Sequence, residues 1–184
     1  MKLKKDSTEQ KLRGAYYTPQ QLATDMVRLF ETDDIKSVLE PSCGDGVFLD
    51  ALSEVHLLNK IHSIEAVEIE EDEAKKVRGR YDNVPQVRVF NEDFFDFYKE
   101  KLGKKTYDLV LGNPPYIRYQ YLQEKQRECQ AQILKSHGMK SNKLINAWVA
   151  FMVACIQLLS EKGKIAFVIP AAILQVAYAE DLRL

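Results

Sequence analysis

The stretch Leu111-Gly112-Asn113-Pro114-Pro115-Tyr116 directly follows an apolar run, Tyr107 to Leu111, that predicts a buried parallel strand. It therefore marks the point where a strand gives way to a loop. In open α/β sheets, ligands bind at the carboxyl ends of the strands. The two prolines fix φ and remove two backbone donors, so the loop is stiff and its carbonyl groups need outside partners. We therefore expect a binding site here.

The side chains of this loop suit one kind of ligand. The amide oxygen of Asn113, the carbonyl of Pro114 and the ring of Tyr116 can hold an exocyclic amino group by its hydrogens and stack on the ring that carries it. The simpler interpretation is a proline-rich turn, since Asn-Pro is a common turn signal. The preceding apolar strand and a glycine-rich loop earlier in the chain favour the binding site.

The composition is that of an ordinary globular protein. The chain has 184 residues, 46% hydrophobic and 29% charged, which predicts one domain with a sizeable core. The formal net charge of −1 gives no global basic signature of a nucleic-acid-binding protein. Two segments, residues 1–13 and 118–143, are locally basic. A solvated helix face and a phosphate contact are both open interpretations of these segments.

The cysteine content indicates a reducing compartment. Cys43, Cys129 and Cys155 are odd in number and widely spaced, which fits neither a disulfide framework nor a zinc site. The N-terminus is charged and has no apolar signal core. The longest apolar run, Leu144 to Leu159, is shorter than the roughly 20 residues that cross a bilayer. We therefore expect a buried helix there, and a cytoplasmic protein with neither a metal nor a membrane partner.

Strands and helices are expected to alternate along the chain. Thr18 and Pro19 suit the N-cap and first position of a helix, and its predicted apolar side consists of Leu22, Met26, Val27 and Phe30. Apolar runs predict strands at 37–40, 64–69, 86–90, 108–111 and 164–169, and helices at 121–135 and 144–161, the second ended by Gly163. This alternation indicates an α/β fold with a doubly wound, mostly parallel sheet and right-handed crossovers.

A glycine-rich loop connects the first predicted strand to a helix. Residues 40–46 read Glu-Pro-Ser-Cys-Gly-Asp-Gly, and Gly44 and Gly46 let the backbone approach a ligand closely. The loop has neither the three-glycine spacing of a dinucleotide site nor the Lys-Ser/Thr pair of a P-loop. Glu40 and Asp45 disfavour a phosphate and favour a cation. A tight strand-to-helix turn is the simpler interpretation of the two glycines alone.

Two more acidic residues follow the next two predicted strands. Glu68 ends the second strand, where a carboxylate can bind the hydroxyls of a ribose. Asp93 follows the third strand, where it can accept from an adenine amino group while Phe94 stacks on the ring. A solvated strand end explains each acid taken alone. Together, the loops after strands one to four fit an adenosine ligand that carries a positive centre.

These motifs, in this order, resemble those of class I S-adenosylmethionine-dependent methyltransferases. The similarity is to the γ-ordered N6-adenine DNA methyltransferases of restriction–modification systems, and it covers the chain from Gly14 onward. It implies a Rossmann-like fold, S-adenosylmethionine as cofactor, and double-stranded DNA with a flipped adenine as substrate. The implied cofactor-binding residues are Tyr17, Thr18, Glu40, Ser42, Gly44, Gly46, Glu68, Asp93, Phe94 and Asn113. The implied catalytic residues are Asn113, Pro114 and Tyr116, and Asn rather than Ser at position 113 is typical of the adenine enzymes.

The resemblance also predicts an incomplete catalytic domain. Members of this family continue into two more strands, a later aromatic motif and a target-recognition domain, and none of these is present in the sequence. We therefore expect a flexible segment at 1–13 and a truncated methyltransferase domain at 14–184 whose sheet lacks its C-terminal strands. A missing recognition domain or a partner subunit would then provide the preference for a DNA sequence.

The implied reaction is direct methyl transfer to an amine. Hydrogen bonds from the adenine amine to the side-chain oxygen of Asn113 and the carbonyl of Pro114 would localise its lone pair. One alternative is an enzyme of the same fold that methylates a protein glutamine or an RNA base, although the segment Tyr16–Pro19 favours the DNA group. The other alternative is a cofactor-binding subunit without catalysis.

Overall fold

The computed structural model describes residues 17–115, 122–139 and 147–169. These residues belong to two compact units. The sheet unit consists of Tyr17–Asn113 and Cys155–Phe167, and the helical unit includes the described residues of Pro114–Ala154. The predicted flexible segment at 1–13 lies outside the described residues. Each unit is considered by itself below.

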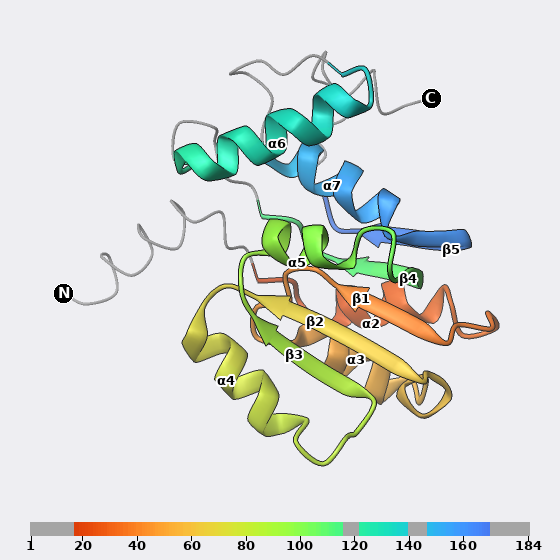
Figure 1. The fold of residues 1–184 in the computed structure, drawn as a ribbon. Coiled ribbons are helices and arrows are strands. Elements are labelled where there is room, and N and C mark those ends of the chain that lie inside the picture. The colour runs from red at the N-terminus through yellow and green to blue at the C-terminus, as the bar shows by residue number, and fades with distance from the viewer. Residues whose placement is uncertain (1–16, 116–121, 140–146, 170–184) are drawn as a thin grey trace. The chain divides into compact units, whose positions relative to one another are not determined.

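The sheet unit is built on five parallel strands. They are β1 (Ser37–Glu40), β2 (Ser63–Glu68), β3 (Val87–Asn91), β4 (Tyr107–Gly112) and β5 (Leu159–Phe167). Their spatial order is β3-β2-β1-β4-β5, so the chain reverses direction across the sheet between β1 and β4 (Figure 1). This confirms the predicted doubly wound α/β fold, and it makes the carboxyl ends of β1 and β4 the place where a ligand is expected.

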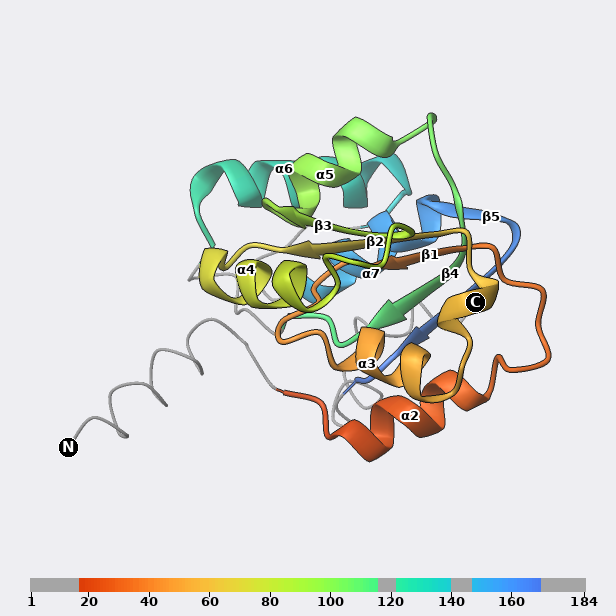
Figure 2. The ribbon, with the colours of Figure 1, turned by 90° about the horizontal axis from the view of Figure 1, so that it is seen from below.

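Helices cover both faces of this sheet. Figure 2 shows α2 (Gln20–Arg28), α3 (Val47–Glu54) and α4 (Glu71–Arg80) on one face and α5 (Phe94–Lys101) on the other. A short 3₁₀ turn, η1, spans Leu58–Lys60. Because both faces are covered, the central strands are largely apolar, and Val38, Leu39, Ile64, Leu109 and Val110 are completely buried. The continuous apolar runs in the sequence were informative for this reason.

The described part of the helical unit contains α6 (Glu124–Ser136) and most of α7 (Ala147–Gln157). A reciprocal capping box between Gln123 and Gln126 begins α6, and Gly138, with φ of +70°, follows its end. The predicted helix at 121–135 is thereby confirmed. None of the helices in the described ranges combines the length and apolar character that crossing a bilayer requires.

The prediction was wrong about where the second long helix ends. Helix α7 stops at Gln157 and β5 already begins at Leu159, so Gly163 lies inside a strand. A Cβ atom on Gly163 would lie 2.7 Å from the carbonyl oxygen of Tyr107, in a register irregularity between β4 and β5. This glycine permits a close backbone approach instead of ending a helix. The wrongly assigned residues, Leu159 to Glu161, are mostly polar and precede a glycine that resembles the end of a helix, so the local pattern gave no strand signal there.

The start of α2 also differs from the prediction. The N-cap residue of α2 is Pro19, and no side chain caps the helix. Of the predicted apolar side, Val27 and Phe30 are buried, whereas Leu22 is 43% exposed; Ala23 and Thr24 are buried as well. The hydroxyl of Thr18 is therefore free of the capping role, and it takes part in the site described next.

Candidate active site

The carboxyl ends of four neighbouring strands carry most of the predicted site residues. Glu40 ends β1, Glu68 ends β2, and Asn113 follows β4. Parallel pairing sets Glu40 beside Ala66 and Glu68 beside Asn91, so these ends lie at one edge of the sheet. Within the sheet unit, the fold therefore brings together three segments that are far apart in the sequence.

The loop after β1 is held in a left-handed conformation. Gly44 and Gly46 have φ angles of +53° and +83°, which residues with a Cβ atom rarely adopt. A Cβ atom on Gly46 would also lie 3.1 Å from a methyl carbon of Val77 in α4. The backbone N–H of Cys43 donates to the carbonyl of Val67 over 2.9 Å, which ties the loop to β2. The backbone conformation therefore favours glycine at both positions. The resulting loop brings backbone atoms to the carboxyl ends of the strands, where a ligand is expected.

Glu40 is a buried carboxylate at the base of this loop. Its residue is 1% exposed, and neither of its carboxylate oxygens has a hydrogen-bond partner among the described residues. Burial raises the pKa of Glu40 well above its ordinary value, and the negative charges of Asp45, Asp50 and Glu68 add to this effect. A buried acid in such a place is costly by itself, and a cation would neutralise it.

Glu68 connects the loops that follow β1 and β2. One carboxylate oxygen accepts from the backbone N–H of Gly44 over 2.7 Å, and the other accepts from the N–H of Glu70 over 2.8 Å. Burial raises the pKa of Glu68, although these two N–H groups oppose the shift. An ionised carboxylate has about four acceptor positions, so capacity for further hydroxyl donors remains.

Asn113 is oriented by two residues from other parts of the sheet unit. Its side-chain nitrogen donates to the hydroxyl oxygen of Thr18 over 3.2 Å. The hydroxyl of Ser42 donates to the backbone carbonyl of Asn113 over 3.1 Å. With the nitrogen facing Thr18, the side-chain oxygen of Asn113 lies on the other side of the carboxamide. No local sequence signal pointed to the contact with Thr18, because 95 positions separate the two residues.

The predicted aromatic and acidic contacts have local roles of their own. Tyr17 is 52% exposed, and burial together with the charges of Glu73 and Asp45 raises its pKa. Asp93 is the N-cap of α5 and accepts from the backbone N–H of Phe95 over 2.8 Å. Phe94, the first residue of that helix, is buried, and its ring centroid lies 5.7 Å from that of Phe95. Helix α5 was absent from the sequence prediction, which treated this segment as a loop.

The two remaining predicted catalytic residues are Pro114 and Tyr116. Pro114 follows Asn113 directly in the chain and is buried. Tyr116 lies outside the described residues. Within the described ranges, no group of three or more His, Cys, Asp or Glu side chains is arranged to hold a metal ion.

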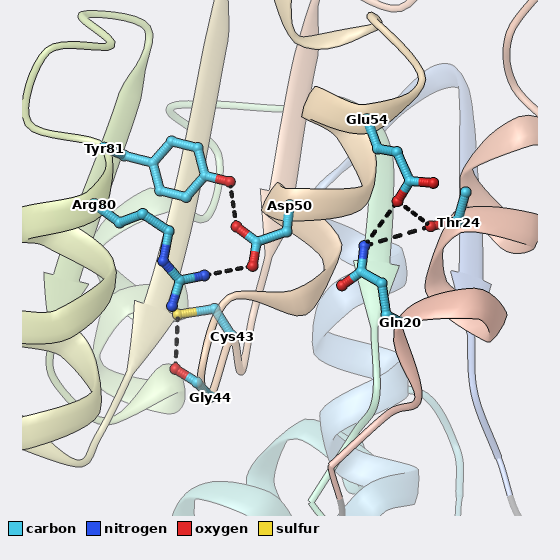
Figure 3. A network of polar contacts seen from close by, with 8 residues as sticks. All are labelled: Gln20, Thr24, Cys43, Gly44, Asp50, Glu54, Arg80 and Tyr81. Carbon is cyan, nitrogen blue, oxygen red and sulfur yellow. Dashed lines mark hydrogen bonds and ion pairs between the residues drawn. The ribbon is translucent and has the colours of Figure 1, made fainter.

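The sequence prediction missed a polar network around α3, which is shown in Figure 3. On one side, Asp50 binds Arg80 and Tyr81 at the end of α4. On the other side, Glu54 accepts from Gln20 and Thr24 in α2. Acidic residues one helical turn apart after a glycine loop were the available signal, but their partners come from helices that only the fold brings together.

Known proteins identify the family. The family model described as "Eco57I restriction-modification methylase" matches residues 51–184, which is well over half of the chain. The chain belongs to this family. Among its curated relatives, the type II methyltransferase M.HincII of Haemophilus influenzae is 30% identical over 173 residues. The alignment covers 92% of this chain and 30% of the relative. The modification methylase CviBIII of Paramecium bursaria Chlorella virus NC1A is 29% identical over 180 residues, covering 93% and 41%. The chain thus spans about a third of the length of such relatives.

Solved structures agree on the fold. A "putative class I S-adenosylmethionine-dependent methyltransferase" of Listeria monocytogenes superposes with a TM-score of 0.70 at 14% identity, over 92% of this chain and 51% of that one. The methyltransferase subunit of a type I restriction-modification system from Streptococcus thermophilus gives a TM-score of 0.67 at 21% identity, over 86% and 35%. This chain therefore has the Rossmann-like fold of class I S-adenosylmethionine-dependent methyltransferases.

The cofactor of this family is S-adenosylmethionine, and the residues at the sheet edge fit its chemistry. The cofactor carries a sulfonium and an ammonium group, both positively charged. The buried carboxylate of Glu40 has no hydrogen-bond partner among the described residues, and Asp45 and Glu68 lie close enough to raise its pKa. These three carboxylates would attract a cation and repel a phosphate.

Proposed function

We propose that this chain contains the cofactor-binding and methyl-transfer residues of a DNA methyltransferase in a restriction–modification system. In this proposal a methyl group passes from S-adenosylmethionine to the N6 amino group of an adenine. The observation that carries the proposal is the position of Asn113. Its carboxamide is oriented by Thr18, and its backbone is bound by Ser42 of the cofactor loop, at the strand ends where the fold places ligands.

Asn113 would activate the amine by hydrogen bonding. The lone pair of an adenine amino group is delocalised into the ring, so the amine is a poor nucleophile. With the amide nitrogen held by Thr18, the amide oxygen is the group that accepts from the amine, and the carbonyl of Pro114 would take its second hydrogen. Preorganised acceptors of this kind act mainly by positioning and electrostatics. We assign adenine because Asn at this position is typical of adenine enzymes of this type.

The remaining residues divide between cofactor and base. When bound, S-adenosylmethionine supplies an electrophilic methyl group on its sulfonium. We assign Glu40 to the positive end of the cofactor, with Tyr17, Thr18, Ser42, Gly44 and Gly46 lining its path, Glu68 to the ribose, and Asp93 with Phe94 to the adenine. Tyr116 would stack on the target base after this base leaves the DNA helix.

The substitution Asn113→Ala tests the catalytic assignment in the full-length protein. We expect cofactor affinity, measured by calorimetry, to stay within about threefold, and the rate of transfer to DNA to fall about a hundredfold or more. Asp25→Asn is the control. Asp25 is an exposed residue of α2 whose carboxylate accepts a hydrogen bond from the side-chain amide of Gln21. Transfer that continues in the Asn113 variant would refute the assignment.

Substrate and product are tested together. Labelled methyl incorporation is compared for duplex DNA, RNA and protein, and the methylated nucleosides are separated by mass spectrometry. N6-methyladenine in DNA is the expected product. N4-methylcytosine would overturn the adenine assignment, and label in RNA or in a protein glutamine would favour the alternative enzymes. Cofactor binding without transfer to any of the three would support a non-catalytic subunit.

A further inference from the structure

Helix α3 connects both halves of the proposed site. It begins directly after Gly46, the last glycine of the cofactor loop. Its two acidic side chains, Asp50 and Glu54, lie one turn apart and point to different neighbouring helices, as Figure 3 shows. Asp50 contacts α4, and Glu54 contacts α2. Each of these helices begins within a few residues of a side chain assigned to the site.

Asp50 holds the end of α4 against the start of α3. One carboxylate oxygen pairs with the guanidinium of Arg80 at 2.5 Å, and the other accepts from the hydroxyl of Tyr81 at 2.6 Å. Tyr81 is buried, so burial and this hydrogen bond both raise its pKa. Charge-assisted bonds of this kind are short and directional. They hold in place the helix that carries Val77, which packs on Gly46.

Glu54 holds α2 through its first turn. A single carboxylate oxygen accepts from the hydroxyl of Thr24 at 2.9 Å and from the side-chain amide of Gln20 at 3.1 Å. Gln20 is the first residue of α2 and lies two positions after Thr18. Thr18 in turn accepts from the amide nitrogen of Asn113. Hydrogen bonds at each end and the backbone from Thr18 to Gln20 therefore link Glu54 to the proposed catalytic amide.

We infer that α3 is the positioning element of the site, with Asp50 setting cofactor affinity and Glu54 setting the rate of methyl transfer. The inference rests on the proposed function. Neither acid touches the reacting atoms, so both are positioning residues. The competing explanation is that the two acids only stabilise the fold. The two explanations differ in a measurable way, because general destabilisation does not separate binding from rate, whereas two independent routes do.

The Asp50 route is tested by binding and rate measured on the same variants. For Asp50→Asn we expect S-adenosylmethionine to bind about tenfold more weakly, with the rate at saturating cofactor within about twofold of wild type. Tyr81→Phe removes a single hydroxyl and is expected to weaken binding by about threefold. The matched control Asp25→Asn leaves both quantities unchanged. Unchanged affinity in both α3–α4 variants, or an equal loss of rate, would overturn this part of the inference.

The Glu54 route predicts the opposite pattern. For Glu54→Gln and Thr24→Val we expect the rate at saturating cofactor to fall about tenfold, because small displacements of a positioned reacting group are costly, while cofactor affinity stays within about twofold. Thr24→Ser keeps the hydroxyl and is expected to retain most of the rate. If Thr24→Ser loses as much rate as Thr24→Val, or if neither variant loses rate, the route does not exist.

A third measurement needs no methyl transfer. The side-chain amide protons of Asn113, observed by NMR, are expected to shift and to exchange faster with water in Thr24→Val than in Thr24→Ser or Asp25→Asn. Identical amide signals in all variants would contradict the Glu54 route directly. If wild type binds no S-adenosylmethionine, the proposed function fails and this inference fails with it. If wild type binds and transfers while the α3 variants behave like the control, only this inference fails.

Discussion

The two ends of the β1–β4 pair treat a carboxylate in opposite ways. Where β4 begins, Asp108 accepts from the backbone N–H groups of Lys36 and Ser37 at 3.0 and 2.9 Å. It also accepts from the hydroxyls of Ser37 and Ser160 at 3.0 and 3.2 Å. Where β1 ends, Glu40 is buried, and no described residue donates a hydrogen bond to it. At one end of these strands a carboxylate therefore accepts several hydrogen bonds, and at the other end a buried carboxylate accepts none from the described residues.

The pKa values differ in direction for the same reason. Burial alone would raise the pKa of Asp108, but the hydrogen bonds from Lys36 and Ser37 outweigh it and lower that pKa. Burial and neighbouring negative charges raise the pKa of Glu40. An acid with its donors in place contributes to stability, whereas an acid without donors reduces it. The contrast separates Asp108, an acid whose hydrogen bonds stabilise the fold, from Glu40, the acid that we propose binds the cofactor.

The largest expected effect comes from breaking the bonded end. In Asp108→Ala, four donors lose their acceptor, and we expect the free energy of unfolding to fall by about 3 kcal/mol. Cofactor affinity in the folded fraction is expected to stay unchanged, because Asp108 lies at the opposite edge from the site. Urea unfolding and calorimetry measure the two quantities. Asp34→Ala, at an exposed ion pair with Lys36, is the control and should cost less than about 1 kcal/mol.

A glycine at each end gives the next largest effect. Gly163→Ala forces a methyl group to within 2.7 Å of the Tyr107 carbonyl, and we expect a loss of about 2 kcal/mol without a change in cofactor affinity. Gly46→Ala is strained by its φ of +83° and by Val77, and we expect a similar loss accompanied by weaker cofactor binding. Equal effects on affinity would show that the two edges are not functionally distinct.

Glu40→Gln should reverse the usual link between stability and binding. Removing a buried charge is expected to raise the stability of the ligand-free protein by about 1 kcal/mol at pH 8. The same change is expected to weaken S-adenosylmethionine binding about tenfold, since the cation loses its counter-charge. Glu68→Gln is the comparison: it accepts from two backbone N–H groups, so its loss should lower stability. A Glu40 variant that is less stable than wild type would contradict the interpretation of this edge.

The smallest effect is a pH dependence with opposite signs at the two ends, at most about 1.4 kcal/mol per pH unit for one group. The folded-state pKa of Glu40 is raised, so its contribution to stability is present below its ordinary value of 4.5 and is lost as pH rises through the raised pKa. The pKa of Asp108 is lowered, so its contribution is present above 3.8 and is lost as pH falls through the lowered pKa. Stability profiles of Glu40→Gln and Asp108→Asn, each subtracted from wild type, should slope in opposite directions.

Local patterns were sufficient for much of the fold. Short apolar runs placed all five strands, although β5 begins at Leu159 and the prediction began it at residue 164. The patterns failed where two structures share one pattern. Leu159 to Glu161 precede a glycine that resembles the end of a helix, whereas pairing with β4 makes these residues the start of β5. Helix α5 was also missed: Asp93 was expected in a loop, and its side chain caps this helix, while its contact with an adenine stays a prediction.

By itself, the sequence determined the alternation of strands and helices and the identity of the loops at the strand ends, because apolar periodicity and glycine placement act over a few neighbouring residues. Only the tertiary structure decided that Thr18 orients Asn113, that α3 connects α2 to α4, and that Glu40 is buried without a hydrogen-bond partner among the described residues. Hydrogen-bond partners and local dielectric depend on which distant segments meet, and strand order sets those meetings. The chemistry proposed for this chain depends on them.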